Sequence, residues 1–264
     1  MDTNVKFVIV LWILGKADCV MIARRKKPGQ HREKIRFRPR RKKRIPAMPV
    51  ERIVFKSRDE WLEARKSQLG GSDASCCLGL NPYKSNVELW EEKTGRRQQE
   101  DISDKPYVKY GILAEPLLRE LFAMDHPQYQ VYYEEHNMFV NSDYPWMHAS
   151  LDGELLDEDR RHGVLEIKTT QIMQSTQWLQ WEDKIPDPYY IQILHCLAVT
   201  GYEFAKLKAQ IKYERDGEVK LSTNHYTIER KDVLADIEAV IEAERRFWGH
   251  VVSGEKPDLI LPAI

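Results

Sequence analysis

The sequence has few cysteines, and they do not have the spacing of a metal site. The four cysteines are Cys19, Cys76, Cys77 and Cys196. They form no C-x-x-C pair, and adjacent cysteines rarely bond to each other, so reduced thiols are the simplest interpretation. His148, His162 and His195 complete no zinc ligand set with them, and zinc is not expected.

A long hydrophobic run is also missing. The opening apolar stretch, residues 7–14, is too short to span a bilayer, and Lys16 and Asp18 interrupt its extension. A secretory signal carries positive charge before its apolar run, whereas here the basic cluster follows it. We therefore expect a cytoplasmic protein without a membrane span, and a signal anchor with its positive flank inside is the alternative. No Walker A motif occurs, so no ATP-driven motor is expected.

Net charge is zero, but the two signs are unevenly distributed. Of the 41 basic and 41 acidic residues, residues 1–50 hold fifteen and three, which leaves 26 and 38 for residues 51–264. Basic runs such as 24–27 and 40–44 repel themselves and usually stay disordered. We predict a basic N-terminal extension over 1–50, either a solvated tail or an arm that contacts DNA phosphates, and one folded domain over 51–264.

The pattern of apolar residues predicts an α/β (α+β) fold. Ser57 is expected to cap a helix with Glu60 in the capping-box position, and Asp216-Gly217 signals a hairpin turn. Pro116 should lie near the start of a helix, or kink it. Helices are expected over 57–66, 70–78, 86–94, 113–124 (with Leu117, Leu118, Leu121 and Phe122 on one face), 188–200 and 233–251, and strands over 130–133, 137–141, 147–156, 163–170, 206–213 and 219–228. Helices that bracket a run of strands indicate a central mixed β-sheet flanked by helices.

One predicted strand carries an acid and an amine on the same side. Over 164–170 side chains alternate, so Glu166 and Lys168 share one face while Leu165 and Ile167 share the other. Metal-assisted phosphodiester cleavage needs such a pair. The carboxylate is a hard ligand for magnesium, and the amine can orient or deprotonate the attacking water and offset charge on the phosphate.

A second carboxylate must help to hold the cation. Asp152 lies fourteen residues before Glu166, and the hairpin expected over 157–162 can return the chain beside it. Gly153 then permits close approach of backbone or substrate. Taken alone, an acid two positions from a lysine is more often a solvated surface pair, so the upstream Asp-Gly is what favours a catalytic site.

Five short blocks occur in the same order as in a known family. They are Trp61–Arg65 with Gly70–Asp73 and Leu78–Tyr83, then Gly111–Glu115, Ser150–Gly153, Glu166–Lys168, and a looser match at Tyr189–Gln192 with Val199–Gly201. With these blocks, residues 58–257 resemble the YqaJ-like viral recombinase family, relatives of phage lambda exonuclease among the PD-(D/E)xK nucleases. The resemblance implies a restriction-endonuclease-like core and a bacterial or phage-encoded protein.

The resemblance also implies a role for each matching residue. Asp152 and Glu166 would bind a pair of magnesium ions, for which manganese can substitute, with the backbone carbonyl of Ile167 as a further ligand. Lys168 would serve the nucleophilic water. Glu115 would act through a metal-bound water, or else be a carboxylate at a helix start. Gln192 would contact the substrate or a metal water, or else be a half-buried structural residue. Arg65 and Ser72 would receive a terminal 5′ phosphate, or else be a surface charge and a helix cap.

The activity implied is 5′→3′ exonuclease digestion of linear double-stranded DNA that leaves single strand for recombination. A single-strand annealing protein and a ring-shaped trimer are the partners implied. An iron–sulfur cluster, present in some superfamily members, is not expected, because Cys76 and Cys77 are adjacent. The alternatives are a structure- or site-specific endonuclease of the same superfamily and a non-catalytic DNA-binding recombination module.

Overall fold

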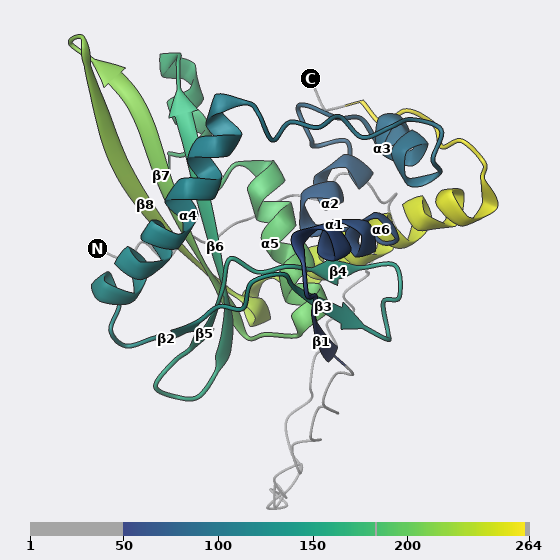
Figure 1. The fold of residues 1–264 in the computed structure, drawn as a ribbon, viewed down its shortest axis with the longest axis horizontal. Helices are drawn as coiled ribbons and strands as arrows, with labels where there is room; N and C mark the ends of the chain where they lie inside the picture. Colours follow the sequence, from purple (N-terminus) through teal and green to yellow (C-terminus); the bar gives the residue numbers. More distant parts are fainter. Residues whose placement is uncertain (1–49, 183, 262–264) are drawn as a thin grey trace, which may run out of the picture. The chain divides into compact units, whose positions relative to one another are not determined.

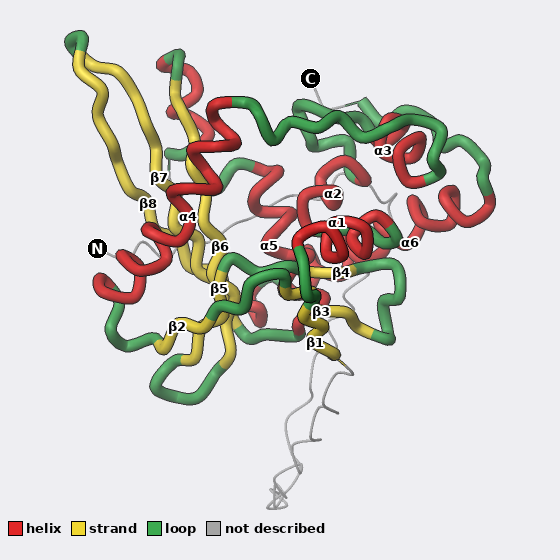
Figure 2. The backbone as a smooth tube through the Cα atoms, in the orientation of Figure 1, coloured by secondary structure: helices red, strands yellow, loops and turns green. Residues whose placement is uncertain are grey.

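The structure, a computed structural model, describes residues 50–182 and 184–261. Figures 1 and 2 show its helices and strands. The helices are α1 (Arg58–Lys66), α2 (Gly71–Cys77), α3 (Asn86–Lys93), α4 (Pro106–Asp125), α5 (Asp187–Thr200) and α6 (Leu234–Ser253), with the short turns η1 (Ser175–Gln180) and η2 (Arg230–Asp232). The strands are β1 (Val50–Val54), β2 (Gln130–Tyr132), β3 (Asn137–Asn141), β4 (His148–Ala149), β5 (Gly153–Leu156), β6 (His162–Ile172), β7 (Phe204–Arg215) and β8 (Glu218–Glu229). The predictions made for residues 1–49 lie outside the described residues.

The larger sheet has five strands in the order β2-β5-β6-β7-β8. Strands β6 and β7 are parallel and α5 connects them, whereas the other neighbours are antiparallel. Parallel neighbours need such a crossover connection. A smaller antiparallel sheet has the order β1-β3-β4. The predicted fold class, an α/β fold with a mixed sheet flanked by helices, is confirmed.

The two faces of β6 are covered by different helices. On one face Leu165 and Ile167 pack in a core with Leu118 and Phe122 of α4, which runs across the sheet in Figure 1. The opposite face of β6 meets α5. Because side chains alternate along a strand, this arrangement directs Glu166 and Lys168 toward α5.

A second core joins the helices beyond the sheet. It consists of buried residues from α2, α3 and α6 and the segment before α2, namely Leu69, Cys76, Cys77, Leu89, Trp90 and Phe247. Helix α2 also packs against α5. The position of α2 relative to the sheet is therefore set by two buried interfaces. None of the helices within residues 50–182 and 184–261 has both the length and the apolar character needed to span a bilayer.

Helix α4 begins earlier than predicted. It starts at Pro106 rather than residue 113, and Pro116 lies in its interior. Pro106, in the first turn, is tolerated because the N–H that a proline lacks would have no helical partner there. The predicted apolar face was also too wide, since Leu118 and Phe122 are buried while Leu117 and Leu121 are 61% and 46% exposed.

The region 147–156, predicted as one strand, is broken in two. Strand β4 belongs to the small sheet and β5 to the large one, so residues 150–152 cross between them. Strand β1 was not predicted, because a five-residue stretch with two charges gains its strand conformation only from pairing with β3. The Ser57 cap is confirmed by its bond from the Glu60 N–H, but the Glu60 carboxylate accepts from Lys56 rather than from Ser57.

Candidate active site

Asp152 reaches the middle of β6 from the crossing between the two sheets. Strands β5 and β6 pair only as far as Gly153 and Leu165, so beyond that point the edge of β6 has no strand beside it. There the Asp152 Oδ2 atom accepts a hydrogen bond of 2.8 Å from the Ile167 N–H. The N–H and C=O of one strand residue point to the same side. The Ile167 carbonyl therefore lies on the strand edge that faces Asp152.

Buried Glu166 and half-buried Lys168 form an ion pair on the α5 side of β6. The Lys168 Nζ and Glu166 Oε1 atoms are 2.5 Å apart, and the Gln192 amide donates to the same oxygen at 2.7 Å. Glu166 is only 1% exposed. Its other oxygen, Oε2, is buried and has no hydrogen-bond partner among the described residues. One carboxylate oxygen is thus oriented by protein groups while the second is left without a donor.

Glu115 approaches the same place from α4. Its carboxylate accepts from Arg119, one helical turn along, and Arg119 also donates to the backbone carbonyl of Asp152. The Arg119 guanidinium lies over the Tyr133 ring, 3.5 Å from its centroid. Arg119 therefore ties the Glu115 side chain to the crossing that carries Asp152. The interpretation of Glu115 as a helix-start carboxylate is wrong, because α4 begins nine residues before it.

Burial makes all three acids harder to ionise. Burial raises the pKa of Glu115 to about 7, and the nearby Asp152 charge adds to the effect. Burial likewise raises the pKa of Glu166 to about 7, although Lys168 acts against it. Burial also raises the pKa of Asp152. Glu166 and Asp152 in turn hold the pKa of Lys168 above its ordinary value despite burial, so its amine keeps its proton.

These groups fit a hard divalent cation. Carboxylate and carbonyl oxygens are the ligands that magnesium prefers, and a cation would stabilise the charged forms of the acids that burial disfavours. The Glu166 Oε2 atom, which has no hydrogen-bond partner among the described residues, is free to bind a cation. Among the described residues, no group of three or more His, Cys, Asp and Glu side chains is arranged as a complete metal site. The Ile167 carbonyl, water or substrate oxygens would therefore have to complete the coordination, as is usual for magnesium.

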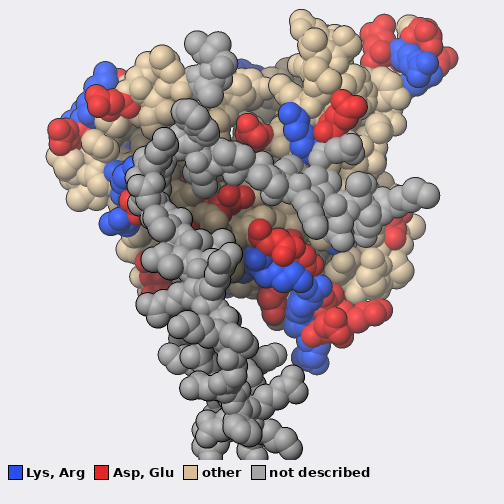
Figure 3. Space-filling model, turned by 180° about the vertical axis from the view of Figure 1, so that it is seen from behind, with Lys and Arg blue, Asp and Glu red and all other residues tan. Residues whose placement is uncertain are grey.

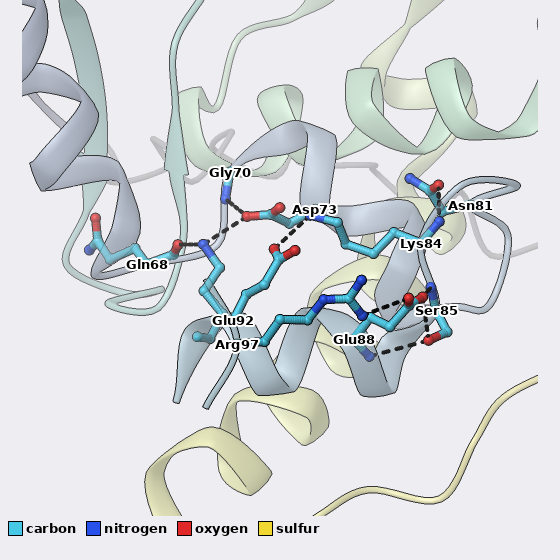
Figure 4. Close-up of polar contacts among 10 residues, drawn as sticks. Gln68, Gly70, Asp73, Asn81, Lys84, Ser85, Glu88, Glu92 and Arg97 are labelled. Carbon is cyan, nitrogen blue, oxygen red and sulfur yellow. Dashed lines mark hydrogen bonds and ion pairs between the residues drawn. The ribbon is translucent and has the colours of Figure 1, made fainter. Parts of the chain in front are cut away.

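Arg65 faces the loop that begins α2. A Cβ placed on Gly70 would lie 3.9 Å from an Arg65 Nη atom and 3.0 Å from Nε2 of His148. The Arg65 guanidinium stacks on the Trp61 ring, 4.3 Å from its centroid, and burial lowers its pKa. Arg65 is therefore more than a surface charge. Ser72 is exposed and is not a helix cap, because Gly70 occupies that position and its N–H is bonded by Asp73 (Figure 4).

Several residues of this region were missed from the sequence. Arg119 was missed although its spacing from Glu115 is that of a helical ion pair. Tyr189, whose ring centroid is 5.4 Å from Lys168 Nζ, carried no sequence signal beyond its place in a family block. His195 is buried, bonded to Glu244 at 2.8 Å and to the His148 carbonyl at 2.8 Å. This bond anchors α5 to β4 and so to the crossing that carries Asp152.

The site thus combines two acids, a strand-edge carbonyl and a lysine on adjoining parts of one sheet. The residues that form it lie in a part of the chain that matches a known family. Residues 60–203 match the family model described as the YqaJ-like viral recombinase domain. The chain is 32% identical over 208 residues to the protein YqaJ of Bacillus subtilis (strain 168), a match that covers 77% of this chain and 59% of that protein. The chain belongs to the YqaJ-like viral recombinase family.

Two solved structures are also similar. An alkaline exonuclease (LHK-Exo) from Laribacter hongkongensis matches with 18% identity and a TM-score of 0.49, over 74% of this chain and 93% of that one. A phage-related exonuclease from Haemophilus somnus 129PT matches with 10% identity and a TM-score of 0.40, over 71% and 96% of the two chains.

Proposed function

We propose that this chain is a magnesium-dependent deoxyribonuclease that digests linear double-stranded DNA from a 5′ end and leaves single strand for recombination. The observation that carries the proposal is the meeting of Asp152, Glu166 and Lys168 at the open edge and one face of β6. Membership of the YqaJ-like viral recombinase family agrees with it.

In this proposal Asp152, Glu166 and the Ile167 carbonyl hold the magnesium ions, and Glu115 acts through a bound water. Magnesium, when bound, would polarise the phosphate and lower the pKa of a water molecule. Hydrolysis would add water across one P–O bond, its hydroxyl to phosphorus and its proton to the leaving oxygen. In the metal-free protein Glu166 and Asp152 hold the pKa of Lys168 above its ordinary value. Lys168 would offset charge on the phosphate and orient the attacking water, or take up its proton once cations neutralise these two acids.

The neighbouring residues position these groups. Gln192 and Lys168 both donate to one oxygen of Glu166, which leaves the second oxygen for the cation. Arg119 holds Glu115 and the Asp152 backbone together. Arg65, beside Gly70 and within electrostatic range of Asp152, is the candidate for the terminal phosphate. The exposed Ser72, in the first turn of α2, is the second candidate.

Charge alone does not explain how DNA would be retained. Residues 51–264 carry a formal charge of −12 from 26 basic and 38 acidic side chains, and on the face drawn in Figure 3 red and blue atoms of described residues lie side by side. A protein that grips DNA by charge offers a basic surface. Enclosure of the duplex by a ring of copies, and transfer of the product strand to an annealing protein, remain part of the proposal.

A digestion assay on end-labelled DNA tests the proposal. Linear duplex with a 5′ phosphate should be degraded in Mg²⁺, faster than duplex without it, and Lys168→Ala or Glu166→Gln should abolish cleavage while DNA binding persists. Cutting of closed circular DNA at a rate similar to that of linear DNA would instead identify an endonuclease. Normal cleavage by both variants would show that the proposed site is wrong, and binding without any cleavage would favour a non-catalytic module.

A further inference from the structure

Tyr83 is the most exposed of the large hydrophobic side chains in the part of the chain that the structure describes, at 93%. It lies on the loop between α2 and α3, in the segment 81–85. A tyrosine ring buries a large apolar area when it is part of a core, and this one buries almost none. Its ring therefore contributes little to folding, and the reason for its position must be sought outside the core.

The loop nevertheless holds Tyr83 firmly. The Asn81 Oδ1 atom accepts bonds from the N–H groups of Tyr83 at 2.8 Å and Lys84 at 3.0 Å, and the Asn81 amide donates to Ser75 of α2. Lys84 pairs with Glu92 of α3 at 2.6 Å (Figure 4). Both sides of Tyr83 are thus tied to helices, although its own ring touches little.

The C-terminal segment also supports the start of the same loop. Gly79 has a φ of 71°, and a Cβ there would lie 2.5 Å from Ile260. Ile260 is in turn held by Asn86, whose side chain bonds the backbone of Asp258 and Ile260 at 2.8 and 3.0 Å. The C-terminal segment therefore packs under the loop, which leaves the outer side for Tyr83. Because the backbone at Tyr83 is already held in place, less conformational entropy is lost when a ligand stacks on its ring.

The loop lies beside the candidate active site. Burial raises the pKa of the Tyr189 phenol, and Tyr83 lies within electrostatic range of it. The Tyr189 ring in turn lies over Lys168, 5.4 Å from Nζ. Helix α2, from which the loop departs, packs on α5, which carries both Tyr189 and Gln192. The exposed Tyr83 ring therefore lies on the side of the site where Tyr189 adjoins Lys168.

We propose that Tyr83 is a stacking platform for one base of the DNA strand that enters the site. This inference rests on the proposed function. Every nucleobase has a π-face, so stacking suits a protein that must accept any sequence. It also supplies affinity that does not depend on positive charge, which suits residues 51–264 because acidic side chains outnumber basic ones there. Tyr83 would thus position the strand whose phosphate lies near Lys168, without touching the reacting atoms itself.

The test measures binding of a fluorescent single-stranded oligonucleotide to the full chain in EDTA, where no turnover is expected. Tyr83→Ala should weaken binding by about 5- to 150-fold, which corresponds to the ~1–3 kcal/mol typical of one stacked base. Tyr83→Phe should bind like the wild type, because stacking needs the ring and not the hydroxyl. Tyr132→Ala, which removes a ring 51% exposed on the edge strand β2, is the matched control and should change nothing.

An abasic scan separates stacking from other losses. In the wild type, one abasic position along the oligonucleotide should weaken binding, and that same position should have no further effect in Tyr83→Ala. Equal binding by the wild type and Tyr83→Ala, or a loss in Tyr83→Phe as large as in Tyr83→Ala, overturns the inference. If wild type and variants all fail to bind or cleave DNA, the proposed function fails and the inference fails with it.

Discussion

Replacing Glu166 by glutamine should stabilise the metal-free protein at alkaline pH. The carboxylate is buried, one of its oxygens lacks a partner among the described residues, and burial outweighs the attraction of Lys168 and raises its pKa to about 7. Ionising it in the folded state is therefore unfavourable. Glutamine has the same shape without the charge, and its carbonyl can still accept from Lys168.

The magnitude follows from the difference in pKa between the unfolded and folded states. The ordinary value is 4.5 and the folded value about 7, a difference equivalent to roughly 3 kcal/mol. Because the folded pKa is the higher one, the folded state binds more protons, and stability falls as pH rises. The loss begins above the unfolded pKa and is complete above the folded one. Between about pH 5 and pH 8 the wild type should lose ~2–3 kcal/mol relative to Glu166→Gln.

Urea unfolding in EDTA at these two pH values measures the effect, read from the midpoint and slope of each transition. Glu63→Gln is the control, because Glu63 pairs with Lys66 at a side-chain exposure of 75% and exposed pairs contribute at most ~1 kcal/mol. If Glu166→Gln is less stable than the wild type at pH 8, the ion pair with Lys168 outweighs the cost of burial. The reasoning about this carboxylate would then be wrong.

Three further predictions concern packing, protons and metals. A Cβ at Gly163 would lie 2.4 Å from the Phe204 ring, so Gly163→Ala should lower the free energy of unfolding by ~1–3 kcal/mol. Gly249→Ala is the control and should not lower it, because a Cβ there would meet nothing within 4 Å. Equal stability of the two variants would contradict the packing argument. Magnesium affinity measured by calorimetry should fall as pH decreases through about 7, because Glu115 and Glu166 take up protons there. An affinity that stays constant from pH 6 to 8 would argue that these two acids are not ligands. Mn²⁺ should support cleavage. Ca²⁺ should bind without turnover, because the looser coordination of calcium positions water poorly. Turnover in Ca²⁺ as fast as in Mg²⁺ would contradict the proposed metal chemistry.

The sequence by itself determined the features that depend on neighbouring residues. Alternation along 164–170 separated Glu166 and Lys168 from Leu165 and Ile167, because successive side chains of a strand point to opposite faces. The turn between β7 and β8 was predictable because Asp216 and Gly217 adopt positive φ values of 58° and 76°, which aspartate and glycine tolerate best. These are local effects, and the structure agrees with them.

Tertiary structure alone decided where the remaining groups lie. Asp152 reaches Ile167 only because the chain leaves the small sheet at β4 and enters the large one at β5, a break that an apolar run cannot reveal. The hydrogen bonds of Arg119 and the position of Tyr83 beside Tyr189 depend on how α4 and α2 pack on the sheet and on α5. Contacts between residues far apart in the chain are set by the sum of many packing interactions, and no short window of sequence contains that sum.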